Sequence, residues 1–199
     1  TTVTYRINVS EAWRLASAPG SSPFTISGGN TGSFSVPMTT VTDPSGGWSN
    51  NTGSATITLN KTTTPTRIEY TSCCKVSTTI NNHDASWDEY IILNTSQPGS
   101  SPVSSLPAII NLPINALAAT YSIPASDPDA GSTLTFGLPN LVSGPLAGQT
   151  EPTGFSINSS GLISMNTVGK TVGQLYNALV TVTDNNGNQI MLDFIIQMV

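Results

Sequence analysis

The segment Ser126–Leu138, SDPDAGSTLTFGL, constrains the fold more than any other because it joins a tight turn to the start of a strand. Asp-Pro-Asp-Ala-Gly contains the residues that favour turns, since Pro fixes φ, Gly accepts positive φ and Asp bonds to its own backbone. From Ser132 onward polar and apolar residues alternate, which is the period-2 pattern of a half-buried strand. The segment therefore predicts a strand end, a turn and a new strand.

The same alternation recurs along the chain. It is clearest in Thr1–Asn8, Gly53–Leu59 and Ala178–Asp184, and an Asn-Asn-Gly turn separates the last of these from a final strand, Gln189–Val199. Only 9% of the residues are charged, well below the usual quarter, so the polar surface consists mainly of Thr, Ser and Asn, which favour strands and turns. No stretch with a 3.6-residue period is long enough for a helix. The sequence predicts an all-β fold.

Domain organisation follows from the segment Asn94–Pro107, NTSQPGSSPVSSLP, which has three prolines and no sustained period. Such composition is typical of a domain boundary. Six or seven short strands are expected on each side of it, which is the number in a β-sandwich. We therefore expect two tandem β-sandwich domains, residues 1–97 and 107–199, joined by a linker at 98–106.

Charge and hydropathy exclude several classes of partner. The six Lys and Arg residues are not clustered, so the chain has no basic patch for a nucleic-acid backbone. No apolar run approaches the ~20 residues that span a bilayer, so this fragment is not expected to insert into a membrane. Any signal peptide or anchor is expected to lie outside it. The weakly charged, polar composition favours an extracellular or cell-surface location.

Three segments of the second half resemble a known family. Ile123–Leu138, Pro152–Ile163 and Val180–Gly187 are similar, in this order, to the dystroglycan-type cadherin-like and related immunoglobulin-like repeats of cell-surface proteins. The resemblance covers about residues 105–199. It implies a Greek-key sandwich, immunoglobulin-like or cadherin-like, that serves as a spacer or adhesive module and in some cases binds calcium.

The resemblance also implies a calcium site, because in cadherins an acidic pair matching Asp127 and Asp129 binds calcium between successive repeats. Asp184 would supply a third carboxylate, and calcium needs about six to eight oxygen ligands in all. The alternative is that these side chains cap their own turns, since Asp and Asn readily bond to nearby backbone groups. Both interpretations remain open, and calcium is the only cofactor expected.

The two cysteines, Cys73 and Cys74, are adjacent, and neighbouring side chains of a regular strand point to opposite faces. They either close a vicinal disulfide ring, which forces a turn or bulge, or stay as free thiols with one buried and one exposed. An exposed free thiol outside the cell would invite intermolecular bonding, so the ring is favoured. With only His83 nearby, the pair does not provide a four-ligand zinc set.

Catalytic signals are weak. His83 is the single histidine, and Asp84 beside it is expected to share a surface turn with it. The chain has neither the G-x-S-x-G elbow of a serine hydrolase nor the H-E-x-x-H motif of a metalloprotease. We therefore expect no enzymatic activity, and a hydrolase is only a remote alternative.

A ligand-binding role has more candidate residues. Trp48 lies between Gly-Gly and Ser-Asn-Asn, so it is expected to be exposed in a long turn, and exposed aromatic rings suit sugars and protein surfaces. The other candidates are Cys73 and Cys74, which could form a stiff apolar patch, and Asp88 and Tyr90. These five residues would form the ligand site of a lectin-like module in the N-terminal domain.

The sequence thus favours a non-enzymatic adhesion or stalk module of a larger cell-surface or secreted protein. Its partner would be a protein or a glycan on another surface, and a carbohydrate-binding module is the alternative. Asn-x-Ser/Thr sequons permit N-glycosylation in a eukaryotic secretory pathway. They begin at Asn8, Asn50, Asn60, Asn94 and Asn158.

Overall fold

The computed structural model describes residues 1–14, 18–42 and 47–199, and within these ranges all regular secondary structure is β-strand. The predicted all-β fold is confirmed. None of the described segments forms a helix that could cross a bilayer. The strands are β1 (Thr2–Arg14), β2 (Ser21–Gly28), β3 (Gly32–Thr42), β4 (Trp48–Asn60), β5 (Thr66–Ser72), β6 (Trp87–Leu93), β7 (Val103–Ser104), β8 (Ile109–Leu112), β9 (Ala119–Ser122), β10 (Ala125–Ser126), β11 (Leu134–Gly137), β12 (Phe155–Ile157), β13 (Leu162–Met165), β14 (Leu175–Asp184) and β15 (Gln189–Met198).

The chain divides into two compact units. The N-terminal unit contains Thr1–Tyr70 and Leu93–Pro98, and the C-terminal unit contains Thr71–Ile92 and Gly99–Val199. This division differs from the expected linear arrangement of 1–97, 98–106 and 107–199. The expected arrangement stays a prediction. The main difference between the expected and the observed division is the segment between β5 and β6, which belongs to the C-terminal unit.

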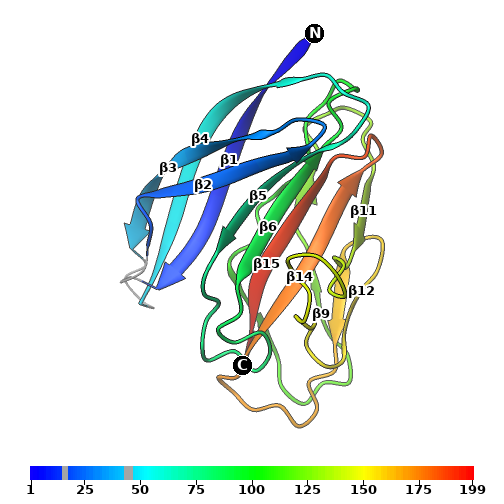
Figure 1. Ribbon diagram of the computed structural model, residues 1–199. Coiled ribbons are helices and arrows are strands. Elements are labelled where there is room, and N and C mark those ends of the chain that lie inside the picture. The colour runs from blue at the N-terminus through cyan, green and yellow to red at the C-terminus, as the bar shows by residue number, and fades with distance from the viewer. Residues whose placement is uncertain (15–17, 43–46) are drawn as a thin grey trace. The chain divides into compact units, whose positions relative to one another are not determined.

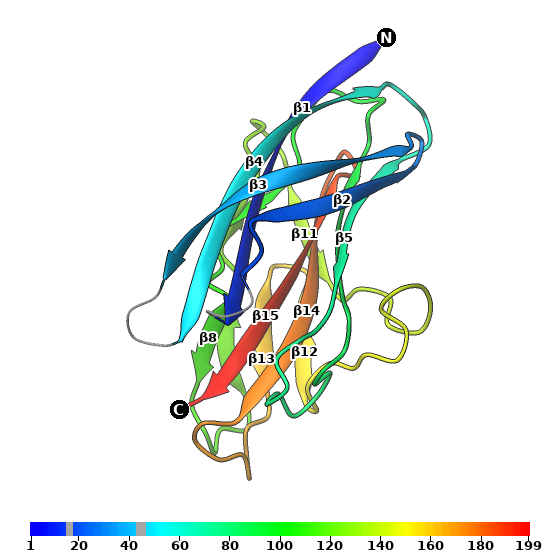
Figure 2. The ribbon, with the colours of Figure 1, turned by 60° about the vertical axis from the view of Figure 1, so that its left-hand side comes forward.

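The N-terminal unit is an antiparallel sheet in the order β1-β4-β3-β2-β5. β1 and β4 pair along their whole length, from Thr2 opposite Asn60 to Arg14 opposite Trp48. The first half of β3 pairs with β2 and its second half pairs with β4. Figures 1 and 2 show the β2–β3 hairpin running at an angle to the long β1–β4 ribbon. Because β3 changes partner partway along, the sheet curls over its own apolar face.

A compact apolar core fills that curl. Phe24 stacks on Phe34, with ring centroids 5.3 Å apart, and lies 5.4 Å from the Tyr70 ring. Gly53 sits where β3 passes β4, and a Cβ atom there would lie 2.4 Å from the Pro37 carbonyl oxygen. The buried apolar residues of the described part of this unit are Ile7, Trp13, Phe24, Val36, Leu59, Ile68, Tyr70 and Leu93.

The C-terminal unit has two packed sheets. The larger one runs β6-β15-β14-β11, with β8 parallel to β15, and the smaller one runs β12-β13-β9. A two-residue ladder joins β10 to β7. Side chains of the larger and the smaller sheet enclose one core, as in a β-sandwich. It contains Ile110, Leu112, Ala119, Ile123, Ile163, Met165, Tyr176, Ala178, Val180, Phe194, Ile196 and Met198.

Strand β14 is the centre of this unit. Tyr176, Ala178 and Val180 face the main core, whereas Leu179 packs with Leu146 and other apolar residues on the opposite side of the sheet. Both faces of the strand are therefore covered. This explains why eight of its ten residues are buried. The polar residues among these eight are Asn177, Thr181 and Asp184.

Gly161 provides a test of the packing between the sheets. Its φ is 86°, and a Cβ atom there would lie 2.8 Å from the Phe136 ring. Gly169 has a similar φ of 77°, but a Cβ there would meet nothing within 4 Å. We expect Gly169→Ala to lower the free energy of unfolding by about 1 kcal/mol through backbone strain alone. Gly161→Ala should cost about 1–3 kcal/mol more, because the new methyl group overpacks the ring.

Chemical denaturation of the two variants measures this difference, and Gly169→Ala is the matched control for backbone strain. Equal destabilisation would show that the approach of Gly161 to Phe136 does not restrict the packing.

Candidate functional site

A buried ion pair lies between the sheet and the loop that precedes β6 in the C-terminal unit. The Lys75 ammonium nitrogen is 2.7 Å from Asp193 Oδ2 on β15 and donates to Asn177 Oδ1 on β14 at 2.8 Å. Asn177 Nδ2 donates in turn to Asp193 Oδ1. Lys75 and Asn177 are 4% and 3% exposed, and a lysine is almost never buried to this extent without a partner.

Two asparagines fasten the same loop along its length. Asn81 Nδ2 donates to the carbonyl oxygens of Thr150 and Asn177, at 2.6 and 2.8 Å, and Asn81 Oδ1 accepts the Asn177 amide at 2.9 Å. Asn82 exchanges hydrogen bonds with the backbone of Thr150, at 2.9 and 2.8 Å. The Ile80 amide donates to the Leu175 carbonyl oxygen at 2.8 Å. The loop is thereby tied to β14 and to the segment around Thr150.

Glu151 lies next to this network. Its Oε2 accepts the Leu179 amide at 3.2 Å, and its Oε1 is buried with no hydrogen-bond partner among the described residues. Burial raises the pKa of the Glu151 carboxyl to about 8. The Leu179 hydrogen bond and the Lys75 charge oppose that rise, while the Asp193 charge adds to it. Glu151 is therefore mostly protonated at neutral pH.

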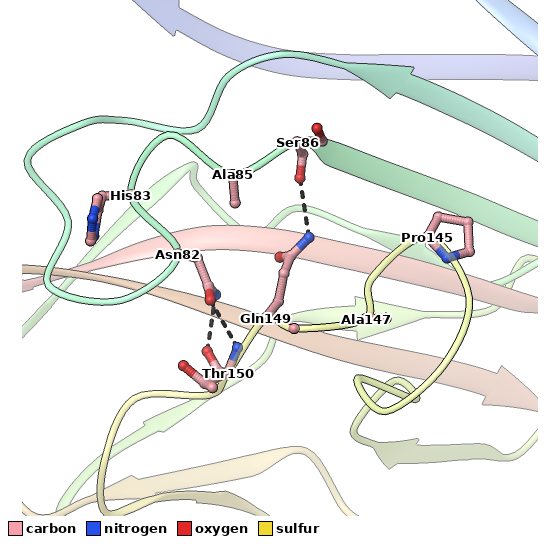
Figure 3. A pocket seen from close by; sticks show the side chains of 9 residues that line it. Asn82, His83, Ala85, Ser86, Pro145, Ala147, Gln149 and Thr150 are labelled. Atoms are coloured by element: carbon pink, nitrogen blue, oxygen red, sulfur yellow. Dashed lines mark hydrogen bonds between the residues drawn. The ribbon is translucent and has the colours of Figure 1, made fainter.

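A polar hollow of about 380 Å³ lies beside the fastened loop (Figure 3). Gln149 Nε2 donates to the Ser86 carbonyl oxygen at 3.1 Å, so the two loops are joined across it. Gln149 is 8% exposed, and its Oε1 has no hydrogen-bond partner within the described part of the chain. The lining residues are Asn82, His83, Ala85, Ser86, Pro145, Ala147, Gly148, Gln149 and Thr150.

The chemistry of this hollow is that of amides and backbone groups. Its lining has one histidine, His83, and no carboxylate, so these nine residues form no Ser-His-Asp triad. They also include no Trp, Tyr or Phe that could stack on a sugar ring. The hollow can present the hydrogen-bond acceptors and donors of its amide and backbone groups to a polar ligand.

The three aspartates expected to bind calcium each accept hydrogen bonds from backbone amides. Asp127 Oδ1 accepts the Asp129 amide at 2.8 Å, and Asp129 Oδ2 accepts the Ser100 amide at 2.6 Å. Asp184 Oδ1 accepts the amides of Asn186 and Asn188, both at 2.8 Å. Asp127 and Asp184 therefore cap their own turns, whereas Asp129 joins its turn to Ser100, 29 residues away. No group of three or more His, Cys, Asp or Glu residues in the described ranges is arranged to hold a metal ion. Calcium binding stays a prediction.

The Cys73–Cys74 pair forms a vicinal disulfide in the structure. Both residues are exposed and lie just after β5, immediately before the buried Lys75. The pair is therefore at the surface of the C-terminal unit, at the start of the fastened loop.

The remaining ligand-binding candidates are distributed over both units. Trp48 is half-buried as the first residue of β4, opposite Arg14, and is not in the long turn that we predicted. Residues 43–46 of that turn lie outside the described ranges. In the C-terminal unit Asp88 is 1% exposed, and Tyr90 packs against the cluster around Leu179. Whether these residues act together with Cys73 and Cys74 stays a prediction.

The residues that the structure does bring together were missed from sequence. Lys75, Asn81 and Asn177 are separated by up to 102 residues along the chain, so no local pattern connects them. A lysine directly after two cysteines and an Asn-Asn pair in a loop look like ordinary surface residues. One signal was available: Asp193 interrupts the apolar strand Gln189–Val199, and a carboxylate within such a strand needs a partner.

The C-terminal unit is thus a β-sandwich with a polar hollow whose nine lining residues form no Ser-His-Asp triad. Part of the chain is similar in sequence to a family of known proteins. Residues 2–95 match the family model described as "Integrin beta-like protein A-E, N-terminal". This range covers β1 to β6, a part of the chain for which the sequence suggested no family, and it does not include the segment 105–199 that resembles dystroglycan-type repeats.

Individual relatives agree with the family match. The chain is 30% identical to Integrin beta-like protein A of Dictyostelium discoideum over 142 residues, which is 67% of this chain. It is 31% identical to Integrin beta-like protein E of the same organism over 121 residues, or 58% of this chain. The matched regions are only 7% and 6% of the two relatives. The chain therefore corresponds to a small part of much longer proteins.

Glu151 makes stability depend on pH. Its folded pKa of about 8 lies above the ordinary value of 4.5, so the folded state keeps this proton after the unfolded state has lost it. The free energy of unfolding should therefore fall as the pH rises from about 4.5 to about 8, by an amount on the order of a few kcal/mol. Glu151→Gln should remove most of this fall, because glutamine does not ionise.

Thermal unfolding of the two proteins across this pH range measures the effect. Asp84→Asn is the matched control, since Asp84 is an exposed carboxylate on the loop before β6 and asparagine tolerates its positive φ. The same pH dependence in Glu151→Gln and the unmodified chain would contradict the assignment.

Proposed function

We propose that the chain is a non-enzymatic extracellular adhesion or stalk module of a larger cell-surface protein. The observation that carries the proposal is the match of residues 2–95 to the N-terminal integrin beta-like family model. Relatives with that name support a surface role. Its partner is then a protein or a glycan on another surface.

The physical properties of the chain agree with this role. A stalk or adhesion module has to hold its shape, and the C-terminal unit contains a long β14–β15 ladder, a closed core and a loop fastened by side-chain hydrogen bonds. The hollow lacks the carboxylate that a histidine general base would need for orientation. A cadherin-like repeat with calcium at Asp127, Asp129 and Asp184 is the finer form of the proposal for residues 105–199.

Carbohydrate binding is the second candidate, and the polar hollow favours it. Sugar hydroxyl groups are donors and acceptors, and they suit the amide-rich lining of the hollow. This site lies in the C-terminal unit, whereas the sequence pointed to Trp48 and the N-terminal domain.

An attachment assay tests the proposal. Beads coated with the 199-residue chain should capture Dictyostelium discoideum cells several-fold better than beads coated with an unrelated β-sandwich protein. The assay is run in calcium and in chelator, and with a panel of competing sugars. A Gln149→Ala chain serves as the matched control for the hollow.

Capture that sugars and Gln149→Ala leave unchanged supports adhesion through a protein partner. Capture that sugars inhibit and Gln149→Ala abolishes supports the carbohydrate-binding alternative. Capture no better than on the control beads contradicts the adhesion proposal.

A further inference from the structure

The β1–β4 ribbon of the N-terminal unit has one face turned to solvent. Residues that pair across its two strands have the same parity, because Thr4 lies opposite Thr58 and Arg6 lies opposite Thr56. The Thr4 and Thr58 hydroxyl oxygens are 3.1 Å apart, and Arg6 Nη2 donates to Ser54 Oγ at 3.2 Å, so even-numbered side chains of both strands share a face. Odd-numbered residues such as Ile7 and Leu59 point to the core on the other side.

Three of the five sequons fall on this outer face. Asn8, Asn50 and Asn60 are all even-numbered and all exposed. Side chains two residues apart project from the same side of a strand, so the hydroxyl residues of the first two sequons, Ser10 and Thr52, also face outward. The register places Ser10 directly opposite Thr52.

The outward placement of these asparagines depends on the pairing register of β1 and β4, which a shift of one residue would change. Asn51, next to Asn50, is fully buried, so an odd register would turn Asn50 into the core. Asn60 lies opposite Thr2 and Asn50 opposite Ala12, which puts the three asparagines level with positions 2, 8 and 12 of β1. At about 3.3 Å per residue they are spaced by roughly 20 and 13 Å along the ribbon.

We propose that Asn8, Asn50 and Asn60 carry N-linked glycans, so that the outer face of the β1–β4 ribbon is a glycosylated face. The proposal rests on the extracellular location in the proposed function, because the modification requires passage through a secretory pathway. Its consequence is that bulky, hydrated sugars cover this face, and a protein partner docks elsewhere on the chain.

The chemistry is a transfer from a lipid-diphosphate-linked oligosaccharide, catalysed by the transferase of the secretory pathway. The asparagine Nδ2 attacks the anomeric carbon of the first sugar and forms the new C–N bond. The bond from that carbon to the phosphate oxygen breaks, and the lipid diphosphate leaves with its electron pair. The amide loses one proton to a base, and no oxidation or reduction takes place.

The other two sequons have different surroundings and are not part of the proposal. Asn94 is half-buried, and its Oδ1 accepts the Ser96 hydroxyl at 2.7 Å. Asn158 is exposed in a turn of the C-terminal unit, where its Oδ1 accepts the Leu162 amide at 2.9 Å.

The test is to secrete the 199-residue chain from a eukaryotic host behind a signal peptide and to map its glycopeptides by mass spectrometry. We expect glycans on Asn8, Asn50 and Asn60, and the loss of one glycan in each of the variants Asn8→Gln, Asn50→Gln and Asn60→Gln. Release with peptide N-glycosidase should convert each modified asparagine to aspartate.

Matched variants separate the sequon from other effects. Ser10→Ala and Thr52→Ala keep the asparagine and should lose the glycan, whereas Ser10→Thr and Thr52→Ser should keep it. A secreted, folded chain in which any of the three asparagines is mostly unmodified overturns the proposal. The readout is a peptide mass, so it is independent of cell attachment, and a failure of the adhesion proposal would leave it unchanged.

Discussion

The buried Lys75–Asp193 pair is the interaction on which the organisation of the C-terminal unit depends. Removing an ammonium and a carboxylate group from water costs several kcal/mol for each ion, and only good geometry with further hydrogen bonds offsets this cost. Asn177 provides those bonds by accepting from Lys75 and donating to Asp193. Because the lysine is stable only with both partners in place, the loop that carries it belongs to the C-terminal unit, although it follows β5 in sequence.

Much of the fold could be predicted from local patterns. The strand Ala178–Asp184 and the Asn-Asn-Gly turn after it were predicted correctly, because turn chemistry and β-branched residues act over a few positions. In the structure β14 begins three residues earlier, at Leu175. The assignment of residues 71–92 to the C-terminal unit could not be predicted. It depends on hydrogen bonds from Asn81 and Asn82 to residues more than 60 positions away, which no local pattern reveals. Trp48 shows the same limit, since glycines before it suggested a turn where β4 already begins.

The candidate sites were less predictable than the fold because each one requires residues from separate elements. Sequence reasoning selected three conspicuous residue types: tryptophan, cysteine and paired aspartates. Asp127 and Asp184 accept hydrogen bonds within their own turns. The polar hollow instead uses inconspicuous amides and backbone groups. This inventory suits recognition better than catalysis, and it agrees with the similarity to integrin beta-like proteins. Under the two proposals, glycans cover the outer face of the β1–β4 ribbon, and the hollow stays open to partners.

Native-state hydrogen exchange tests most directly the claim that the buried pair and its asparagines make the loop an integral part of the C-terminal unit. The Lys75 and Ile80 amides donate to Ala85 and Leu175 carbonyl oxygens, and the Asn177 amide of β14 donates to the Asn81 side chain. We predict that all three amides exchange with the same opening free energy as the rest of β14, because loop and strand open together. Exchange of Lys75 and Ile80 that is orders of magnitude faster than that of β14 would contradict the account.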